Sequence, residues 1–133
     1  MKTILILLLL LIANVSMCQS VIHTKDITVP PDLTNINAQK ISGDSLVSTY
    51  IIYIKENVPM HKHASHSENV LVLEGEATMV VGETTQEIKA GDLIFIPANT
   101  FHEVTVTSEI PLKVISIQAP EFDGTDRIPY VKN

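Results

Sequence analysis

The chain has 133 residues, of which 45% are hydrophobic, and a formal net charge of −6 at pH 7. This length accommodates one domain and the hydrophobic content is sufficient for a buried core, so a second domain is not expected. The acidic excess is spread thinly, and no stretch resembles the basic stripe that a nucleic-acid backbone requires. We therefore expect no nucleic-acid partner.

The first twenty residues have the layout of a secretory signal peptide. Lys2 supplies a positive start, Ile4 to Ala13 form an almost unbroken apolar run, and Val15 to Ser20 are mostly small or polar. A membrane-spanning anchor needs about 20 apolar residues, and this run is shorter. We expect residues 1–20 to be removed and the mature protein to be secreted or periplasmic.

The cleavage site depends on how Cys18 is used. Val15-Ser16-Met17-Cys18 approximates a lipoprotein box, but Met17 stands where Gly, Ala or Ser is expected. Ordinary cleavage at or shortly after Cys18 is therefore favoured, and it removes the chain's only cysteine, leaving no disulfide and no thiol nucleophile. If Cys18 is instead lipidated, a linker tethers the domain to a membrane.

After the signal, the sequence predicts an extended segment and then a series of short strands. Residues 21–44 have weak periodicity and contain Pro30-Pro31, which indicates an extended N-terminal segment with one edge strand. From there, β-rich runs alternate with turn signals at 57–59, 74–75, 82–83, 90–92, 97–99 and 108–111. The predicted strands are Thr49–Lys55, Val70–Leu73, Ala77–Val81, Gln86–Ile88, Leu93–Ile96, Glu103–Thr107 and Leu112–Gln118. Many short, evenly spaced strands without a convincing helix indicate a sandwich or barrel.

Several of these runs are apolar on both faces. If Glu68 points inward, Val70 and Val72 do too, while Leu71 and Leu73 face the opposite way. Something must cover that outer face, and the N-terminal segment and a second subunit are the two alternatives.

A group of metal-ligand residue types lies between positions 61 and 102. His61 and His63 are two residues apart, so on a strand they project from one face, and Glu68 returns beside them after a short irregular step. His102 is a distant fourth member. Imidazole and carboxylate suit divalent Fe, Mn, Ni, Co and Zn, and four protein ligands leave about two positions on an octahedral ion. We predict one such ion, bound by these four residues.

The full spacing is His61-x-His63, four residues, Glu68, six residues, Gly75, and later Gly91, five residues, Pro97, x, Asn99, two residues, His102. This resembles the cupin family. Three positions depart from the family pattern: Lys55 stands where a glycine opens the first motif, Asn99 replaces an inner glycine, and Val106 replaces a frequent asparagine. None is a ligand, and asparagine tolerates the left-handed conformation almost as well as glycine.

The resemblance implies an all-β fold, a jelly-roll (double-stranded β-helix) barrel over residues 45–120 with the metal inside one end. The charged tail, residues 121–133, is expected to be a lid or an arm. Cupins often pair through apolar outer faces, which favours a homodimer.

Other residues are weaker candidates. A lone histidine is more often structural than a ligand, so His23 and His66 are expected on the surface or behind the ligands. No general base stands out beyond the weak candidates Tyr53, His66 and Glu76. The expected inward-facing core or pocket residues are Tyr53, Met60, Met79, Phe95, Val104 and Val106.

Two functions remain open. The first is an enzyme, an isomerase, lyase or dioxygenase, that acts on a small oxygen-rich metabolite chelated by the metal through two oxygens. By analogy with small cupins of sugar-acid catabolism, the substrate could be a breakdown product of external polysaccharides. The alternative is a non-catalytic module that binds a small molecule or a metal. A structural relic is less favoured, because buried His and Glu clusters are costly unless paired or metallated.

The signal-peptide hypothesis predicts a mature chain that begins near Gln19. Mass analysis of the protein from its native host measures this directly. An intact Met1 on an intracellular product would contradict export, and a diacylglycerol mass on Cys18 would identify a lipoprotein.

Overall fold

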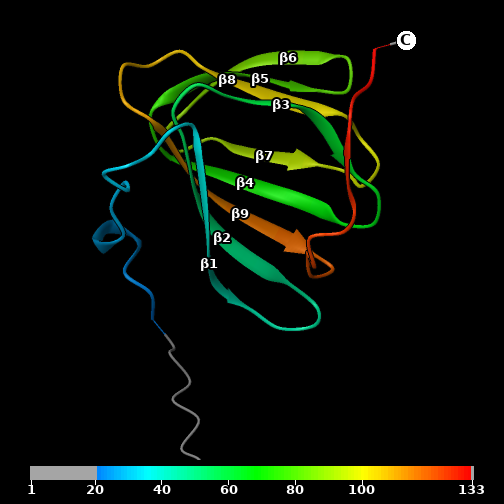
Figure 1. Cartoon of the computed structure of the whole chain (residues 1–133), viewed down its shortest axis with the longest axis horizontal. Coiled ribbons are helices and arrows are strands. Elements are labelled where there is room, and N and C mark those ends of the chain that lie inside the picture. The colour runs from blue at the N-terminus through cyan, green and yellow to red at the C-terminus, as the bar shows by residue number, and fades with distance from the viewer. Residues whose placement is uncertain (1–20, 133) are drawn as a thin grey trace, which may run out of the picture.

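The computed structural model describes residues 21–132, so the predicted signal peptide and Cys18 lie outside the described residues. Two five-stranded antiparallel sheets form the fold. Sheet A contains, in spatial order, β1 (Ile36–Gly43), β2 (Ser48–Ile54), β9 (Leu112–Ala119), β4 (Ser67–Glu74) and β7 (Leu93–Ile96). Sheet B contains β10 (Arg127–Pro129), β3 (Asn57–His63), β8 (His102–Val106), β5 (Glu76–Val81) and β6 (Thr84–Lys89). Figure 1 shows the sheets as two facing layers, which confirms the predicted jelly-roll barrel.

The core fills the space between the two sheets. Val72 on β4, Met79 on β5 and Leu112 on β9 are buried there, together with Ile54, Ala77, Ile88, Ile96, Val104 and Val114. The predicted alternation of β4 is confirmed, because Val72 is buried in this core and Glu68 and Val70 line the internal cavity. Apolar inward positions from both sheets therefore provide the burial that stabilises the barrel.

All seven predicted strands are present, but the turn predicted at residues 57–59 is wrong, because these residues belong to β3. Pro59 has no N–H to donate to a ladder, and the pairing of β3 with β8 shifts register between Val58 and His61. This register shift accommodates Pro59, so the strand continues to His63.

The turns follow the predicted chemistry. Asn99 has a φ of 62°, which confirms that asparagine occupies a left-handed position in place of glycine. Its backbone N–H donates to the His63 carbonyl at 2.6 Å, so this turn is fixed to the end of β3. Gly75 has a φ of 84°, and a Cβ there would lie 3.0 Å from the Leu112 Cα.

The N-terminal segment covers part of the outer face of sheet A. It contains the short 3-10 helix η1 (Thr24–Asp26) before the edge strand β1. Tyr53 donates from its hydroxyl to the Ile27 carbonyl at 2.6 Å. Lys113, which is 4% exposed, donates from Nζ to the Thr24 and Ile27 carbonyls at 3.1 and 2.9 Å. This segment is thus one of the two expected covers.

Three inward predictions are wrong. Met60 precedes the inward-facing His61 on β3 and belongs neither to the core nor to the cavity wall. Ile52 and Ile54 line the cavity, so Tyr53 between them lies on the opposite face of β2, under the N-terminal segment. Phe95 is 58% exposed, whereas its neighbour Ile96 is 3% exposed. Apolar runs on both faces carry no alternation, so the sequence could not assign the inward side of β2 and β7.

The C-terminal tail crosses the open end of the barrel. In Figure 1 it runs from the end of β9 in sheet A across to sheet B, where β10 pairs with β3. We call residues 120–130 the C-terminal strap. Phe122 N–H donates to Ser48 Oγ at 3.0 Å, and Tyr130 N–H donates to the Met60 carbonyl at 3.0 Å, so the strap is bonded to both sheets.

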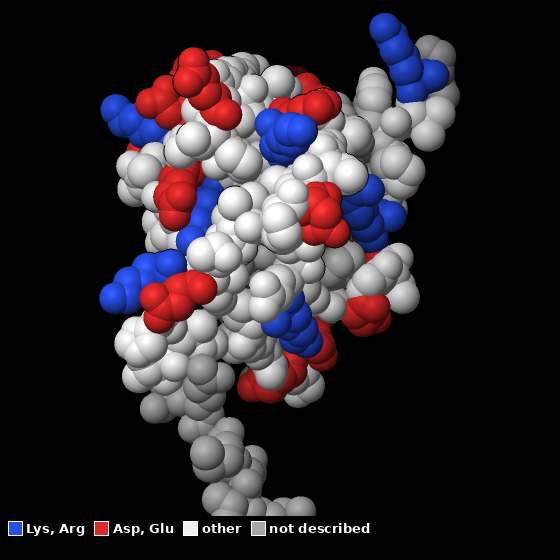
Figure 2. Space-filling model, turned by 60° about the vertical axis from the view of Figure 1, so that its left-hand side comes forward, with Lys and Arg blue, Asp and Glu red and all other residues white. Residues whose placement is uncertain are grey.

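Acidic and basic side chains are interspersed on the face shown in Figure 2. Nowhere between residues 21 and 132 is there a helix long and apolar enough to cross a membrane.

Candidate metal centre

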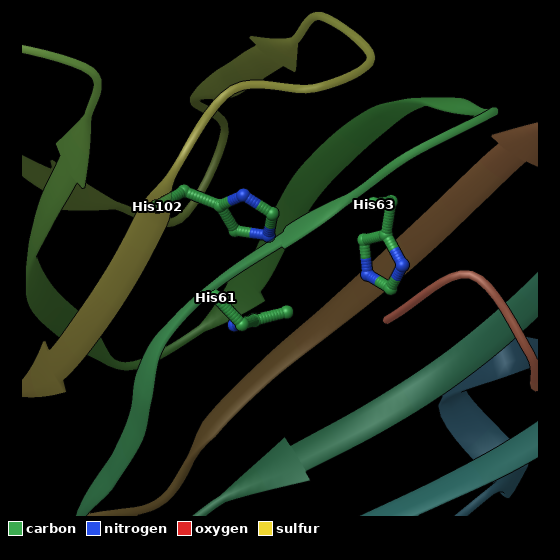
Figure 3. A group of neighbouring side chains, drawn as sticks. All are labelled: His61, His63 and His102. Carbon is green, nitrogen blue, oxygen red and sulfur yellow. The ribbon is translucent and has the colours of Figure 1, made fainter. Parts of the chain in front are cut away.

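Two neighbouring strands of sheet B bring three of the predicted ligands together. His61 on β3 is the register partner of His102 on β8, and their ring centroids lie 4.2 Å apart. His63, on the same face of β3, has its ring 5.1 Å from that of His61. One nitrogen from each ring lies within 4.8 Å of the others, and all three residues are buried. Figure 3 shows the rings gathered close together, so these histidines form a cluster that could bind a metal ion.

The hydrogen bonds of the three rings select which nitrogen remains available. Nδ1 of His61 lies 2.9 Å from the Pro59 carbonyl, and Nδ1 of His102 lies 3.0 Å from the Thr100 carbonyl. Nδ1 of His63 lies 3.0 Å from Asp126 Oδ1. Carbonyl and carboxylate oxygens only accept, so each Nδ1 carries the proton and donates. Nε2 of each ring is thereby left with a free lone pair, the arrangement that metal-ligating histidines adopt.

Burial disfavours the protonated form of His61 and His63. Desolvation, reinforced by electrostatic repulsion from the neighbouring His102, lowers the pKa of His61 to about 3. Burial also lowers the pKa of His63 despite its hydrogen bond to Asp126. Neutral imidazole is the form that ligates a metal, so His61 and His63 do not need to lose a proton before binding at neutral pH.

Glu68 lies beside the histidines and is oriented by polar residues of β9. Its Oε2 is 3.7 Å from His102 Nε2. Ser116 donates from its hydroxyl to Glu68 Oε1, and Gln118 Nε2 donates to Ser116 Oγ at 3.0 Å. This chain of two hydrogen bonds leaves Oε2 directed towards the imidazoles. The structure therefore places all four predicted ligands in one site.

The site opens onto an internal cavity of about 340 Å³, within the range of small-molecule pockets. The four predicted ligands line it together with Tyr50, Gln118, Phe122 and Arg127, and most of the remaining wall is apolar. Phe122 and Arg127 belong to the C-terminal strap, which therefore contributes to the cavity wall.

Residues 50–118 match the Cupin domain family. The chain belongs to the cupin family. This cupin is also similar to protein MJ1618 of Methanocaldococcus jannaschii, with 30% identity over 77% of this chain and 82% of that protein.

Solved structures show the same fold. A protein with a double-stranded β-helix domain from Klebsiella pneumoniae superposes with a TM-score of 0.71 at 16% identity, covering 85% of this chain and 98% of that one. Pac13 of Streptomyces, a nucleoside dehydratase, superposes with a TM-score of 0.63 at 16% identity, covering 74% of this chain and 82% of that one. At this identity the likeness concerns the fold alone.

The donor set of this cupin fits a divalent ion. Three neutral nitrogens and one carboxylate oxygen suit Fe, Mn, Ni, Co or Zn, whereas Mg and Ca prefer sites composed of oxygen. Any such ion would be held by His61, His63 and His102, with Glu68 completing the set.

None of the three weak catalytic candidates lines the cavity. Tyr53 lies on the outer face of sheet A, and Glu76 is exposed at the start of β5. His66 is 2% exposed and packs behind His63, with ring centroids 4.1 Å apart. Of the two positions predicted for His66, the surface and the space behind the ligands, the structure shows the second.

Sequence reasoning missed the residues that support the site. Ser116 and Gln118 had a usable signal, because they are polar at inward positions of an otherwise apolar strand. Asp126 and Arg127 lie in a charged tail with no local pattern, and only the fold brings them to β3.

Replacing His61 and His63 together with alanine should abolish stoichiometric metal binding, because two of the four donors are removed. His23→Ala is the control, since His23 is exposed and remote in sequence from the site. Elemental analysis of purified protein gives the metal content. Full occupancy in the double variant would contradict the assignment.

Proposed function

We propose that this cupin is an exported, metal-dependent enzyme that acts on a small oxygen-rich molecule chelated through two oxygens. The observation that carries the proposal is the set of three Nδ1-anchored imidazoles beside Glu68, opening onto a largely apolar cavity. An isomerase, a lyase or a dioxygenase fits this site. A bound divalent ion would supply Lewis acidity or, if it is iron, chemistry with dioxygen.

The protein's own residues indicate the class of molecule. Arg127 lines the cavity together with the three histidines, and it is the register partner of His63 in the pairing of β10 with β3. Its charge contributes to the lowered pKa of His61. None of the ion pairs between residues 21 and 132 involves Arg127. An unpaired guanidinium recognises carboxylates, and the apolar walls favour a flat or partly apolar body. An anionic chelator with a carboxylate is therefore the preferred ligand, and a sugar acid from polysaccharide breakdown is one member of that class.

Support from similar proteins is limited to analogy of fold. Pac13, a nucleoside dehydratase, demonstrates that a barrel of this shape can hold an enzyme for a small oxygen-rich molecule. Export is supported by the sequence of residues 1–20 alone.

The alternative function is a non-catalytic binding module for a small molecule or a metal. It is favoured by one observation, that Tyr53, His66 and Glu76 do not reach the cavity. Turnover of any bound chelator by the metal-loaded protein would exclude it.

We also propose that the protein is a homodimer. The N-terminal segment is hydrogen-bonded to β2 and β9, and two cross-strand rows lie on the outer face of β7, β4 and β9. One row is Leu93, Leu71 and Ile115, and the other is Phe95, Asn69 and Ile117, in which only Asn69 is polar. The most exposed members are Leu93 at 65%, Phe95 at 58% and Ile117 at 39%. A contiguous apolar patch of this kind marks an interaction surface.

Bidentate oxygen ligands should bind to the metal-loaded protein. Oxalate, an α-hydroxy acid or a catechol should raise its melting temperature at millimolar concentration, because a ligand that binds only the folded state stabilises it. The metal-free protein should respond far less. If none of the ligands shifts the metal-loaded protein, the site is closed and the enzyme proposal fails.

Arg127→Gln refines this prediction. It should weaken oxalate binding about tenfold, because a charged hydrogen bond is lost, and should leave catechol binding much less affected. Lys55→Gln is the control, since Lys55 is exposed and does not line the cavity. Equal losses for both ligands would contradict the carboxylate role of Arg127.

The dimer proposal predicts that Phe95→Glu yields monomers by light scattering, because a buried charge would face the same patch on the partner. Leu46→Glu should remain dimeric, since Leu46 is 73% exposed in the turn between β1 and β2. A monomeric wild-type protein would contradict the proposal.

A further inference from the structure

The three imidazoles differ in what holds them. His61 and His102 donate to carbonyls two residues away in sequence, so their orientation comes with their own strands. His63 instead donates to the side chain of Asp126, 63 residues further along the chain. His63 is therefore the one of these three ligands whose orientation depends on a distant segment.

Asp126 is bound tightly at the turn between β3 and β4. Its Oδ2 accepts from the Ser65 backbone N–H at 3.1 Å and from the Ser65 hydroxyl at 2.9 Å, while Oδ1 accepts from His63. The Asp126 carbonyl accepts from the Ala64 N–H at 3.0 Å. Both carboxylate oxygens are thus occupied, and the side chain is only 10% exposed. The carboxylate is held in a fixed position relative to the His63 ring.

Further contacts join His63 to the C-terminal strap. The Phe122 ring packs edge-on against that of His63, with centroids 5.1 Å apart, and Arg127 is the register partner of His63 in the pairing of β10 with β3. The strap therefore contacts this ligand through a carboxylate, an aromatic ring and a strand.

We propose that Asp126 is a positioning residue for His63, and that the C-terminal strap and the metal ion stabilise each other through it. The inference rests on the metal-binding part of the proposed function. A carboxylate on Nδ1 fixes the tautomer and the ring orientation and raises the basicity of Nε2. Coupling between two binding events is reciprocal. If docking of the strap raises the affinity of His63 for the metal by some factor, metal binding must favour docking of the strap by the same factor.

The neighbouring His66 allows an alternative role for Asp126, as a ligand of a second ion. Its Nδ1 lies 2.9 Å from Asp126 Oδ2, without the alignment of a hydrogen bond, and neither ring nitrogen has a hydrogen-bond partner within residues 21–132. His63, His66 and Asp126 also lie close enough to hold an ion of their own. In that arrangement Asp126 would be a ligand of a second ion, and the protein would bind two ions per chain.

The test compares Asp126→Asn with Asp123→Asn in the full chain. Asp123 is an exposed residue of the same strap, and its side chain accepts hydrogen bonds from Thr125. Asp123→Asn therefore removes the same charge from the strap as Asp126→Asn does, at a residue that is not bonded to His63. Titration with Zn²⁺ against a chromophoric chelator should show one ion per wild-type chain, 10- to 100-fold weaker binding in Asp126→Asn, and wild-type affinity in Asp123→Asn. Nitrogen-15 NMR of the ring should show the Nδ1–H tautomer of His63 in the wild type and its loss or mixture in Asp126→Asn.

A second measurement needs no variant. In the wild type, Zn²⁺ should slow amide exchange at Tyr130, whose N–H bonds the strap to β3. Wild-type affinity in Asp126→Asn, unchanged exchange at Tyr130, or two ions per chain with one lost in Asp126→Asn would each overturn the inference. A wild-type chain that binds no metal would instead overturn the proposed function itself.

Discussion

The pairing of β3 with β8 is the constraint on which the site depends. It sets His61 directly opposite His102 and, by strand alternation, places His63 on the same face. Burying three imidazoles together is unfavourable unless their polar atoms find partners. Each Nδ1 has one in an oxygen acceptor, and desolvation keeps the ring of His61 neutral. Nε2 of each ring keeps a free lone pair, and one cation could accept all three.

The rest of the molecule supports this arrangement from two directions. From sheet A, Ser116 and Gln118 orient the Glu68 carboxylate towards the imidazoles. From the C-terminus, the strap brings Asp126 to His63 and contributes Phe122 and Arg127 to the cavity wall. The barrel therefore provides a candidate metal centre in which sheet A orients the carboxylate of Glu68 and the C-terminal strap forms part of the cavity wall. Under the proposed function, the guanidinium of Arg127 at the cavity would favour an anionic chelator over a neutral one, and the apolar walls would favour a flat or partly apolar body.

The sequence predicted the fold and the four proposed ligands because both depend on local patterns. Apolar runs and turn residues located the strands, and the spacing from His61 to His102 indicated four residues that the structure brings together. β3 was partly misread because Pro59 is normally a strand breaker, and its register shift cannot be seen in the sequence. Tyr53 and Phe95 were assigned to the wrong face because their strands are apolar on both sides. The contact of Asp126 with His63 could not be predicted, because the two residues are 63 positions apart in the sequence and only the fold brings them together.

X-ray absorption at the metal edge of the metal-loaded protein tests the central claim most directly. The account predicts a first coordination sphere with about three imidazole nitrogens and at least one oxygen at about 2.0–2.2 Å, as is usual for a borderline divalent ion such as zinc. Multiple scattering from the imidazole rings should be visible. A coordination sphere of oxygen alone, without imidazole scattering, would contradict the account, because the ion would then be bound away from His61, His63 and His102.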